Sequence, residues 1–175
     1  AGAGHLLEEM TIISRETKMM DEIKSWSEEI DKNANNHEAY NKRGLVYFSL
    51  GRVENALGDF TKAAEIKPDE ANYYYNKATV VAMNGNLEDA KTDFSKAIEL
   101  NPKYAEAYYN RGKVNADLNK LTEAIQDFTN AILYNPEYSQ AYNNRGIAKN
   151  IMSDSKEGCE DIQKAMQLGS DRAKK

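Results

Sequence analysis

Several positions of this 175-residue chain recur at a fixed interval of 34 residues. A small residue occupies the first position, a second small residue the next, a bulky apolar residue the third and alanine the fourth. In chain order these are Gly44, Ala78, Gly112 and Gly146; Ala56, Ala90, Ala124 and Gly158; Phe60, Phe94, Phe128 and Ile162; Ala63, Ala97, Ala131 and Ala165. A constant period of roughly 20–50 residues indicates a repeat architecture, in which each unit buries its apolar face against its neighbours.

Each unit has the pattern of two helices joined by a turn. Apolar residues of the first unit recur at three- and four-residue steps, which places them on one helix face: Ala56, Leu57, Phe60, Ala63 and Ala64. Gly51 and Gly85 fall between the two periodic stretches, where a left-handed residue ends a helix. Prolines stand where the second helix must stop: Pro68, Pro102 and Pro136. Small residues let the paired helices approach closely, and the aromatic ring fills the space beside them.

A helix-turn-helix unit of this length and pattern resembles the tetratricopeptide repeat family. The residues of the first unit that carry the resemblance are Tyr40, Gly44, Tyr47, Ala56, Phe60 and Pro68. The resemblance covers roughly residues 37–172. It implies an all-α fold, a right-handed α-solenoid of antiparallel helix pairs, in which the first helices of successive repeats line a concave groove.

We expect a single solenoid domain with repeats at residues 37–70, 71–104, 105–138 and 139–172. The last repeat is divergent, because Gly158, Ile162 and Ser170 depart from the pattern. Residues 5–36 lack the small-residue markers but keep helical spacing at Ile23, Trp26 and Ile30. We interpret this segment as a degenerate N-terminal unit that caps the first repeat, with a single long helix over residues 5–33 as the alternative. Residues 1–4 are compatible with a remnant of cloning.

A charged pair recurs in all four units. The basic residues are Arg43, Lys77, Arg111 and Arg145, and the acidic residues sixteen positions later are Asp59, Asp93, Asp127 and Asp161. We predict structural ion pairs that link the two helices of a unit, or neighbouring units. Such partly buried pairs would fix the register of the helices more than add stability. The alternative is a row of arginines that binds a ligand.

The family resemblance implies that side chains of the first helices face the groove. One repeat position there carries Lys42, Asn76, Asn110 and Asn144. An amide can donate to and accept from a peptide unit, so three asparagines could form a ladder along an extended ligand; alternatively, asparagine is merely common at this position. Hydrogen bonds alone give too little affinity, so apolar anchors must contribute. The groove candidates are Asn41, Lys42, Leu45, Tyr75, Asn76, Thr79, Tyr109, Asn110, Lys113, Asn143, Asn144 and Ile147.

One subtype of the family clamps the acidic C-terminal tail of heat-shock chaperones with lysines, asparagines and an arginine. The two registers available in this chain place there Asn41, Leu45, Asn76, Glu106 and Asn110, or Tyr75, Thr79, Asn110, Gln140 and Asn144. The central asparagine matches, but Glu106 would repel a carboxylate where the subtype has a lysine. We therefore expect that a chaperone C-terminal tail is not the partner.

Composition argues against other classes of function. The net charge of -5 disfavours nucleic acid and anionic membranes, and the sequence has no apolar run of 18 residues, so we expect no direct membrane insertion. The histidines His5 and His37 lack partners at metal-ligand spacing, and Cys159 is expected to be buried beside Gly158. No phosphate-binding or nucleophile motif occurs. We expect no metal, no cofactor and no catalysis.

The leading hypothesis is a non-catalytic adaptor or scaffold that binds another protein in its groove, as an extended peptide or a partner helix. The alternative is a self-associating structural protein, a homodimer through the ends of the solenoid. Its candidate residues at one end are Met10, Ile12, Ile13, Met19 and Met20, with the last helix at the other end. A third interpretation is a fragment of a larger enzyme. A cytoplasmic location is favoured, or a periplasmic or anchored one if a signal segment was removed.

Overall fold

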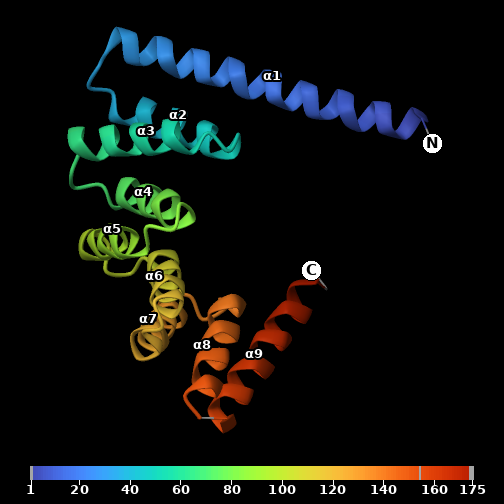
Figure 1. The fold of residues 1–175 in the computed structure, drawn as a ribbon, viewed down its shortest axis with the longest axis vertical. Helices are drawn as coiled ribbons and strands as arrows, with labels where there is room; N and C mark the ends of the chain where they lie inside the picture. The colour runs from blue at the N-terminus through green and yellow to red at the C-terminus, as the bar shows by residue number, and fades with distance from the viewer. Residues whose placement is uncertain (1, 154, 174–175) are drawn as a thin grey trace. The chain divides into compact units, whose positions relative to one another are not determined.

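A computed structural model describes the backbone of residues 2–153 and 155–173 and the side chains of residues 10–153 and 156–169. Within these ranges the secondary structure is helical, without strands, and the chain is an all-α helical-repeat solenoid, as the sequence predicts (Figure 1). The helices are α1 (Gly2–Lys32), α2 (His37–Ser49), α3 (Val53–Ile66), α4 (Ala71–Met83), α5 (Leu87–Leu100), α6 (Ala105–Asp117), α7 (Leu121–Tyr134), α8 (Ser139–Ile151) and α9 (Ser155–Ala173).

The helices form two compact units, Ala1–Val80 and Val81–Lys175. In the first unit α1 packs on α2 and α2 on α3, while Val80 of α4 joins Ala56 and Phe60 of α3 in a buried cluster. In the second unit each helix from α5 to α9 packs on the next one along the chain. The expected grouping of all repeats into a single domain stays a prediction.

The small and aromatic positions of the repeat meet inside two of the hairpins, α2–α3 and α6–α7. A Cβ atom on Gly44 would lie 2.8 Å from Cε1 of Phe60, and one on Gly112 would lie 2.7 Å from Cε1 of Phe128. Both phenylalanines are only 1% exposed. The ring therefore lies against the bare backbone of the paired helix, which explains why these two positions carry glycine.

The turn inside each repeat contains one residue in the left-handed conformation. These residues are again 34 positions apart: Gly51 (φ 69°), Gly85 (φ 82°), Asn119 (φ 58°) and Ser153 (φ 76°). After Gly51 the backbone N–H of Arg52 donates to the carbonyl of Tyr47 at 2.8 Å, which closes the end of α2. Glycine adopts this conformation without strain, so the first two turns are the more relaxed ones.

Helix α1 is continuous from Gly2 to Lys32, as in the second of the two readings of residues 5–33. Its residues 19–32 lie 34 positions before α3, and Ile23 and Ile30 are buried. Glu22 and Glu29 stand where the next repeat has the buried Ala56 and Ala63. Charged side chains on the outer face of a helix suit a capping unit, and the cap expected here stays a prediction. The proposed remnant at residues 1–4, His5 and Ser170 lie outside the described side chains.

The expected burial of Cys159 is wrong, because its side chain is exposed. In the first repeat the equivalent residue, Leu57, is partly buried and packs against the cluster of Ala56, Phe60 and Val80. Among the described helices, α9 packs on α8.

Candidate functional site

The arginines that recur at one repeat position, Arg43, Arg111 and Arg145, each join three helices. Nε and Nη2 of Arg43 in α2 donate to the two carboxylate oxygens of Asp59 in α3, at 2.8 and 2.7 Å. Its remaining group, Nη1, donates to the hydroxyl of Ser27 in α1 at 3.0 Å. The guanidinium thus holds its own hairpin together and fastens it to the preceding helix.

The same arrangement recurs twice in the second unit. Arg111 binds Asp127 at 3.0 and 2.7 Å and the hydroxyl of Ser95 at 3.0 Å. Arg145 binds Asp161 at 2.7 and 2.6 Å, and its Nη1 donates to the hydroxyl of Thr129 at 3.2 Å. The guanidinium carbons lie 5.5–5.7 Å from the rings of the tyrosines three residues earlier, Tyr40, Tyr108 and Tyr142.

These contacts direct the arginine donors into the protein rather than toward a ligand. The hydrogen bond to Asp59 raises the pKa of Arg43 against the opposing effect of burial. Burial alone would raise the pKa of Asp161, but the hydrogen bond and charge of Arg145, together with the charge of Lys149, hold that pKa below its usual value. Lys77 and Asp93 belong to the two separate units, and their pairing stays a prediction.

The groove candidates of the first unit lie on α2 and α4. Lys42 and Leu45 are exposed, whereas the candidates listed next are half-buried: Asn41, Tyr75, Asn76 and Thr79. Nδ2 of Asn76 donates to Oδ1 of Asn41 at 2.8 Å, and the Thr79 hydroxyl donates to the backbone carbonyl of Tyr75. The amide of Asn76 therefore links α4 to α2, the first helices of two successive repeats.

In the second unit the candidates lie on α6 and α8. Nδ2 of Asn144 donates to the hydroxyl of Tyr109 at 3.2 Å, and Nδ2 of Asn143 donates to Oδ1 of Asn144 at 3.4 Å. Burial raises the pKa of Tyr109, although the hydrogen bond from Asn144 opposes this shift. Asn110 is half-buried, and Lys113 is exposed with its Nζ 5.8 Å from the ring centre of Tyr109. The Asn144–Tyr109 bond repeats the bridge seen in the first unit.

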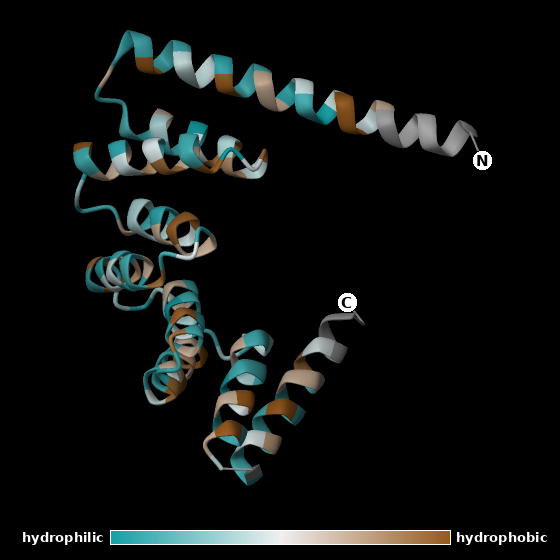
Figure 2. Cartoon of the chain, viewed as in Figure 1, coloured by the Kyte–Doolittle hydropathy of each residue, from teal (hydrophilic) through white to brown (hydrophobic). Residues whose placement is uncertain are grey.

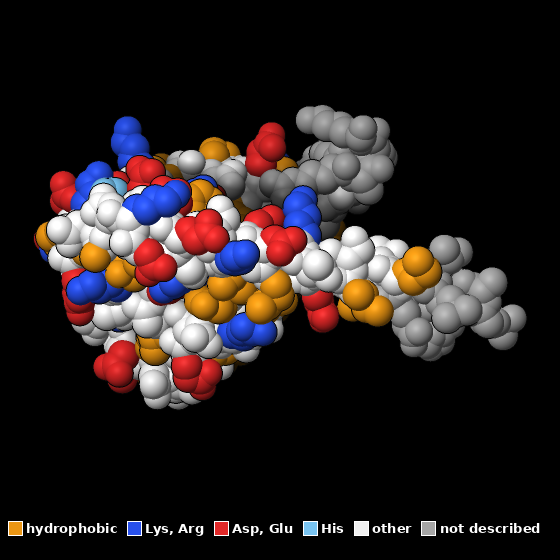
Figure 3. All heavy atoms as spheres, turned by 90° about the horizontal axis from the view of Figure 1, so that it is seen from above, with side chains coloured by type: hydrophobic (Ala, Val, Ile, Leu, Met, Phe, Trp, Pro, Cys, Tyr) orange, Lys and Arg blue, Asp and Glu red, His pale blue; other side chains and the backbone are white. Residues whose placement is uncertain are grey.

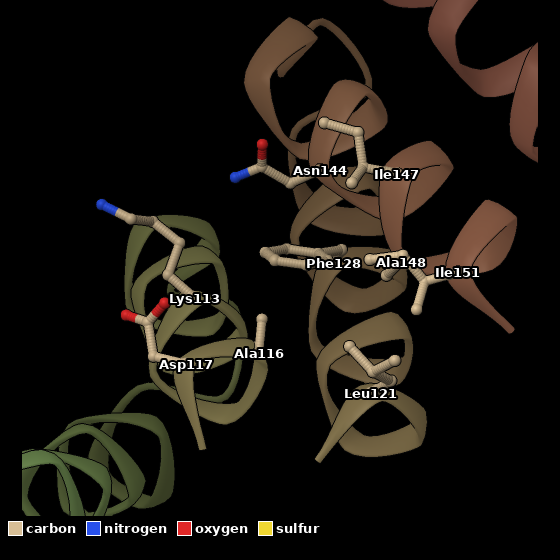
Figure 4. Close-up of a pocket in the computed structure, with 9 residues that line it drawn as sticks. All are labelled: Lys113, Ala116, Asp117, Leu121, Phe128, Asn144, Ile147, Ala148 and Ile151. Atoms are coloured by element: carbon tan, nitrogen blue, oxygen red, sulfur yellow. The ribbon is translucent and has the colours of Figure 1, made fainter. Parts of the chain in front are cut away.

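An open hollow of about 240 Å³ lies between α6, α7 and α8, and we call it the apolar hollow (Figure 4). Phe128 lines it together with exposed Ile147 and Ile151, which are 46% and 63% exposed. Lys113 and Asp117 line it from α6. The other lining residues are Ala116, Leu121, Asn144 and Ala148.

A second hollow of about 310 Å³ adjoins the first, because Asn144 lines both. We call it the polar hollow, since four hydroxyl or amide residues of α8 line it: Ser139, Gln140, Asn143 and Asn144. Tyr109 of α6 and two residues of α9, Ala165 and Met166, complete it. The two hollows follow the same pair of helices, α6 and α8.

Sequence reasoning reached part of this site. It named Lys113, Asn144 and Ile147, but it missed Asp117 and Ile151, which lie one helical turn further on. The signal was available, because residues four apart share a helix face. It also missed the hydroxyl partners of the arginines, Ser27, Ser95 and Thr129, which precede each arginine by sixteen residues.

Other kinds of site find little support. No group of His, Cys, Asp or Glu among the described residues could hold a metal ion. None of the described helices combines the length and the apolar character needed to cross a membrane.

Successive helix hairpins with a hollowed face of first helices define a helical-repeat protein. The profile described as Tetratricopeptide repeat matches residues 37–70 and 105–138, and the profile described as TPR repeat matches residues 82–119. The chain belongs to the tetratricopeptide repeat family. No curated protein sequence matches it.

Solved structures give the same fold. The crystal structure of MamA is 25% identical, with a TM-score of 0.82 over 87% of this chain and 90% of that one. YrrB, described as a TPR protein with an unusual peptide-binding site, is 21% identical, with a TM-score of 0.75 over 92% of this chain and 83% of that one, and shows the fold alone. The first TPR of Spaghetti (RPAP3), bound to the HSP90 peptide SRMEEVD, is 25% identical, with a TM-score of 0.66 over 67% of this chain and 93% of that one.

Repeats of this family form interaction modules rather than catalytic centres, because the stacked hairpins present an extended binding surface. The chain is a protein-interaction scaffold, and its partners are proteins.

Proposed function

We propose that the chain is a non-catalytic adaptor that binds a segment of a partner protein on its first helices, with the apolar hollow as the anchor. The observation that carries this proposal is the exposure of Ile147 and Ile151 over the hollow. Contiguous exposed apolar surface with a polar rim is typical of an interaction site. The amides of Asn41, Asn143 and Asn144 lie beside it or in the equivalent place of the first unit, where they can add hydrogen bonds.

Changing Ile147 to Asp is expected to abolish this anchor. A carboxylate in the hollow would place an unpaired charge against the partner's apolar side chain, so we expect binding to weaken by at least about tenfold. The measurement is quantitative capture of partners from a native lysate by wild-type and variant protein, with the circular dichroism of both recorded.

Leu133→Asp is the matched control, because Leu133 is 66% exposed on α7 and does not line the hollow. It introduces the same charge on a neighbouring helix of the same unit. Equal capture by wild type and Ile147→Asp, or equal losses in the two variants, would remove the hollow from the proposal.

We further propose that acidic chaperone tails are not the ligand, although a structural relative binds the HSP90 peptide SRMEEVD. Glu106 is exposed on α6 and Asp117 lines the hollow, so two carboxylates flank the surface where the acidic peptide would lie. Fluorescence anisotropy with labelled SRMEEVD should show no saturable binding at micromolar protein. A salt-sensitive micromolar Kd that weakens on Asn110→Ala would contradict this expectation.

A second candidate function is self-association through helix α1. Four large apolar side chains are exposed there, Met10, Ile12, Ile13 and Met20. Brown bands recur along α1 in Figure 2, and orange side chains are visible on the projecting arm in Figure 3. Solvent-exposed apolar residues at successive turns are the usual basis of helix pairing between subunits.

If α1 pairs two copies, light scattering after size exclusion should show a dimer at high concentration. Ile13 is exposed on α1, so the variant Ile13→Glu should then be monomeric. A wild-type chain that stays monomeric at several hundred micromolar would eliminate this second candidate.

A further inference from the structure

We infer that the partner segment is an amphipathic α-helix that lies along the furrow between α6 and α8. This inference rests on the proposed function above and specifies the shape and chemistry of its ligand. The furrow has two regularly spaced walls. Tyr109, Lys113 and Asp117 follow one another at four-residue steps along α6. Gln140, Asn144, Ile147 and Ile151 follow at three- and four-residue steps along α8.

The volume of the apolar hollow limits what can enter it. At about 240 Å³ it is smaller than the roughly 300–1,000 Å³ of pockets that enclose small molecules. It has an apolar floor at Phe128 and apolar walls at Ile147 and Ile151 (Figure 4). One large apolar side chain of a partner fits this description better than a free ligand does.

The adjoining polar hollow requires a different side chain. Gln140, Asn143 and Asn144 offer amide donors and acceptors, and Ser139 adds a hydroxyl. Ser139 donates to Gln140, Asn143 to Asn144, and Asn144 to Tyr109, but each amide nitrogen carries a second hydrogen. An apolar residue would cover these remaining donors, whereas the oxygen of an amide or a hydroxyl would accept from them. The partner must therefore change from apolar to polar as it passes Asn144.

The spacing of the two hollows favours a helix over an extended chain. Gln140 lines the polar hollow and Ile147 the apolar one, and seven residues of α8 span about 10 Å at roughly 1.5 Å per residue. A helix lying alongside covers that distance in seven residues, and its residues i and i+7 share a face. An extended chain covers the same distance in about three residues, at about 3.3 Å each. Its residues i and i+3 point to opposite faces, so they cannot enter both hollows.

The charges on α6 agree with the same geometry. Lys113 and Asp117 are separated by one helical turn on the rim of the apolar hollow. A partner helix can present an acidic and a basic residue with the same separation, so both rim charges can be paired at once. The inferred ligand is thus a helix with an apolar residue, an amide or hydroxyl residue seven positions away, and a flank of mixed charge.

The test uses a phage-displayed library of random 16-residue peptides, selected on the full chain and counter-selected on Ile147→Asp. Selected peptides should carry an apolar residue and an Asn, Gln, Ser or Thr seven positions apart, with no proline between them. As synthetic peptides they should gain helical circular dichroism on binding. Replacing their central residue by proline should weaken binding by more than about tenfold, because proline breaks a helix.

A second variant separates the two hollows. Gln140→Ala in the chain should reduce its affinity for the selected peptide. The affinity for the same peptide with alanine at the polar position should stay unchanged. Peptides that depend on Ile147 but contain proline, or that bind equally well after the proline substitution, would overturn the helical inference while leaving the groove in place. A selection that yields no Ile147-dependent peptide would overturn the proposed function itself.

Discussion

Asp127→Ala is expected to lower the free energy of unfolding by about 3–5 kcal/mol, the range for removing one partner of a buried ion pair. Asp127 is 3% exposed and accepts three hydrogen bonds, two from Arg111 and one at 2.9 Å from Nδ2 of Asn115. Without the carboxylate, the partly buried guanidinium retains the hydroxyl of Ser95 but loses its charged partner, and the buried amide nitrogen of Asn115 loses its acceptor. Urea denaturation followed by circular dichroism measures the change.

Glu99→Ala is the matched control. Glu99 forms an ion pair of 2.9 Å with Lys96 on the surface of α5, and its side chain is 68% exposed. Exposed pairs contribute roughly 0–1 kcal/mol, so this loss should be several times smaller. The double variant Arg111→Met/Asp127→Leu should recover part of the stability, because it removes both charges. Similar losses for Asp127→Ala and Glu99→Ala would show that burial of the pair has no consequence.

The ion pairs could be predicted from the sequence, but their additional hydrogen-bond partners could not. A basic and an acidic residue sixteen positions apart in every repeat predict a contact, and the structure forms it at Arg43, Arg111 and Arg145. The third partner was not predicted, because serine and threonine are common on any helix surface. Asn115 was not predicted for a different reason: its repeat position carries Lys149 in the next unit, which approaches Asp161 at 3.3 Å. Asparagine and lysine both contact the buried aspartate from this repeat position, so the contact leaves no repeated residue type in the sequence.

The fold followed from the sequence more completely than the site did. Periodic small and aromatic residues constrain packing, and two glycines and three prolines mark boundaries that the 34-residue period carries over to the remaining repeats. Helix α1 was harder, because it lacks the small residues that would signal a turn. Its apolar spacing suits one helix or the second half of a repeat, and the structure has a continuous helix whose C-terminal part occupies that place.

The groove was predicted as a row of amides that bind a ligand. In the structure, two of these amides form hydrogen bonds to the neighbouring helix of the same chain. Asn76 and Asn144 donate to the residue 35 positions earlier, across to the previous first helix. Sequence spacing places them on the correct face but does not reveal whether a neighbour or a ligand takes their hydrogen bonds. The hollow depends on how Phe128, Ile147 and Ile151 pack together, which is a property of three helices at once.

Gly112→Ala is expected to destabilise the chain by about 1–3 kcal/mol, in the range of overpacked cores. The new methyl carbon would lie 2.7 and 2.9 Å from two ring carbons of Phe128 and 3.2 Å from Cβ of Asp127. Phe128 is 1% exposed, so a shift of the ring away from the new methyl carbon toward the apolar hollow would cost part of its burial. The ring or the helix must shift, and the arginine clamp at Asp127 would shift with it. Thermal unfolding of the variant measures the loss.

Gly58→Ala separates this packing effect from the general preference of helices for alanine. Gly58 lies within α3 and is exposed, with no atom within 4 Å of a Cβ placed there. Alanine should therefore raise stability by roughly 0.5–1 kcal/mol, since it lowers the entropy lost on folding. The same substitution in two helices should thus shift Tm in opposite directions. If Gly112→Ala instead raised Tm as Gly58→Ala does, the close contact between glycine and phenylalanine could not be what holds the hairpin at its observed spacing.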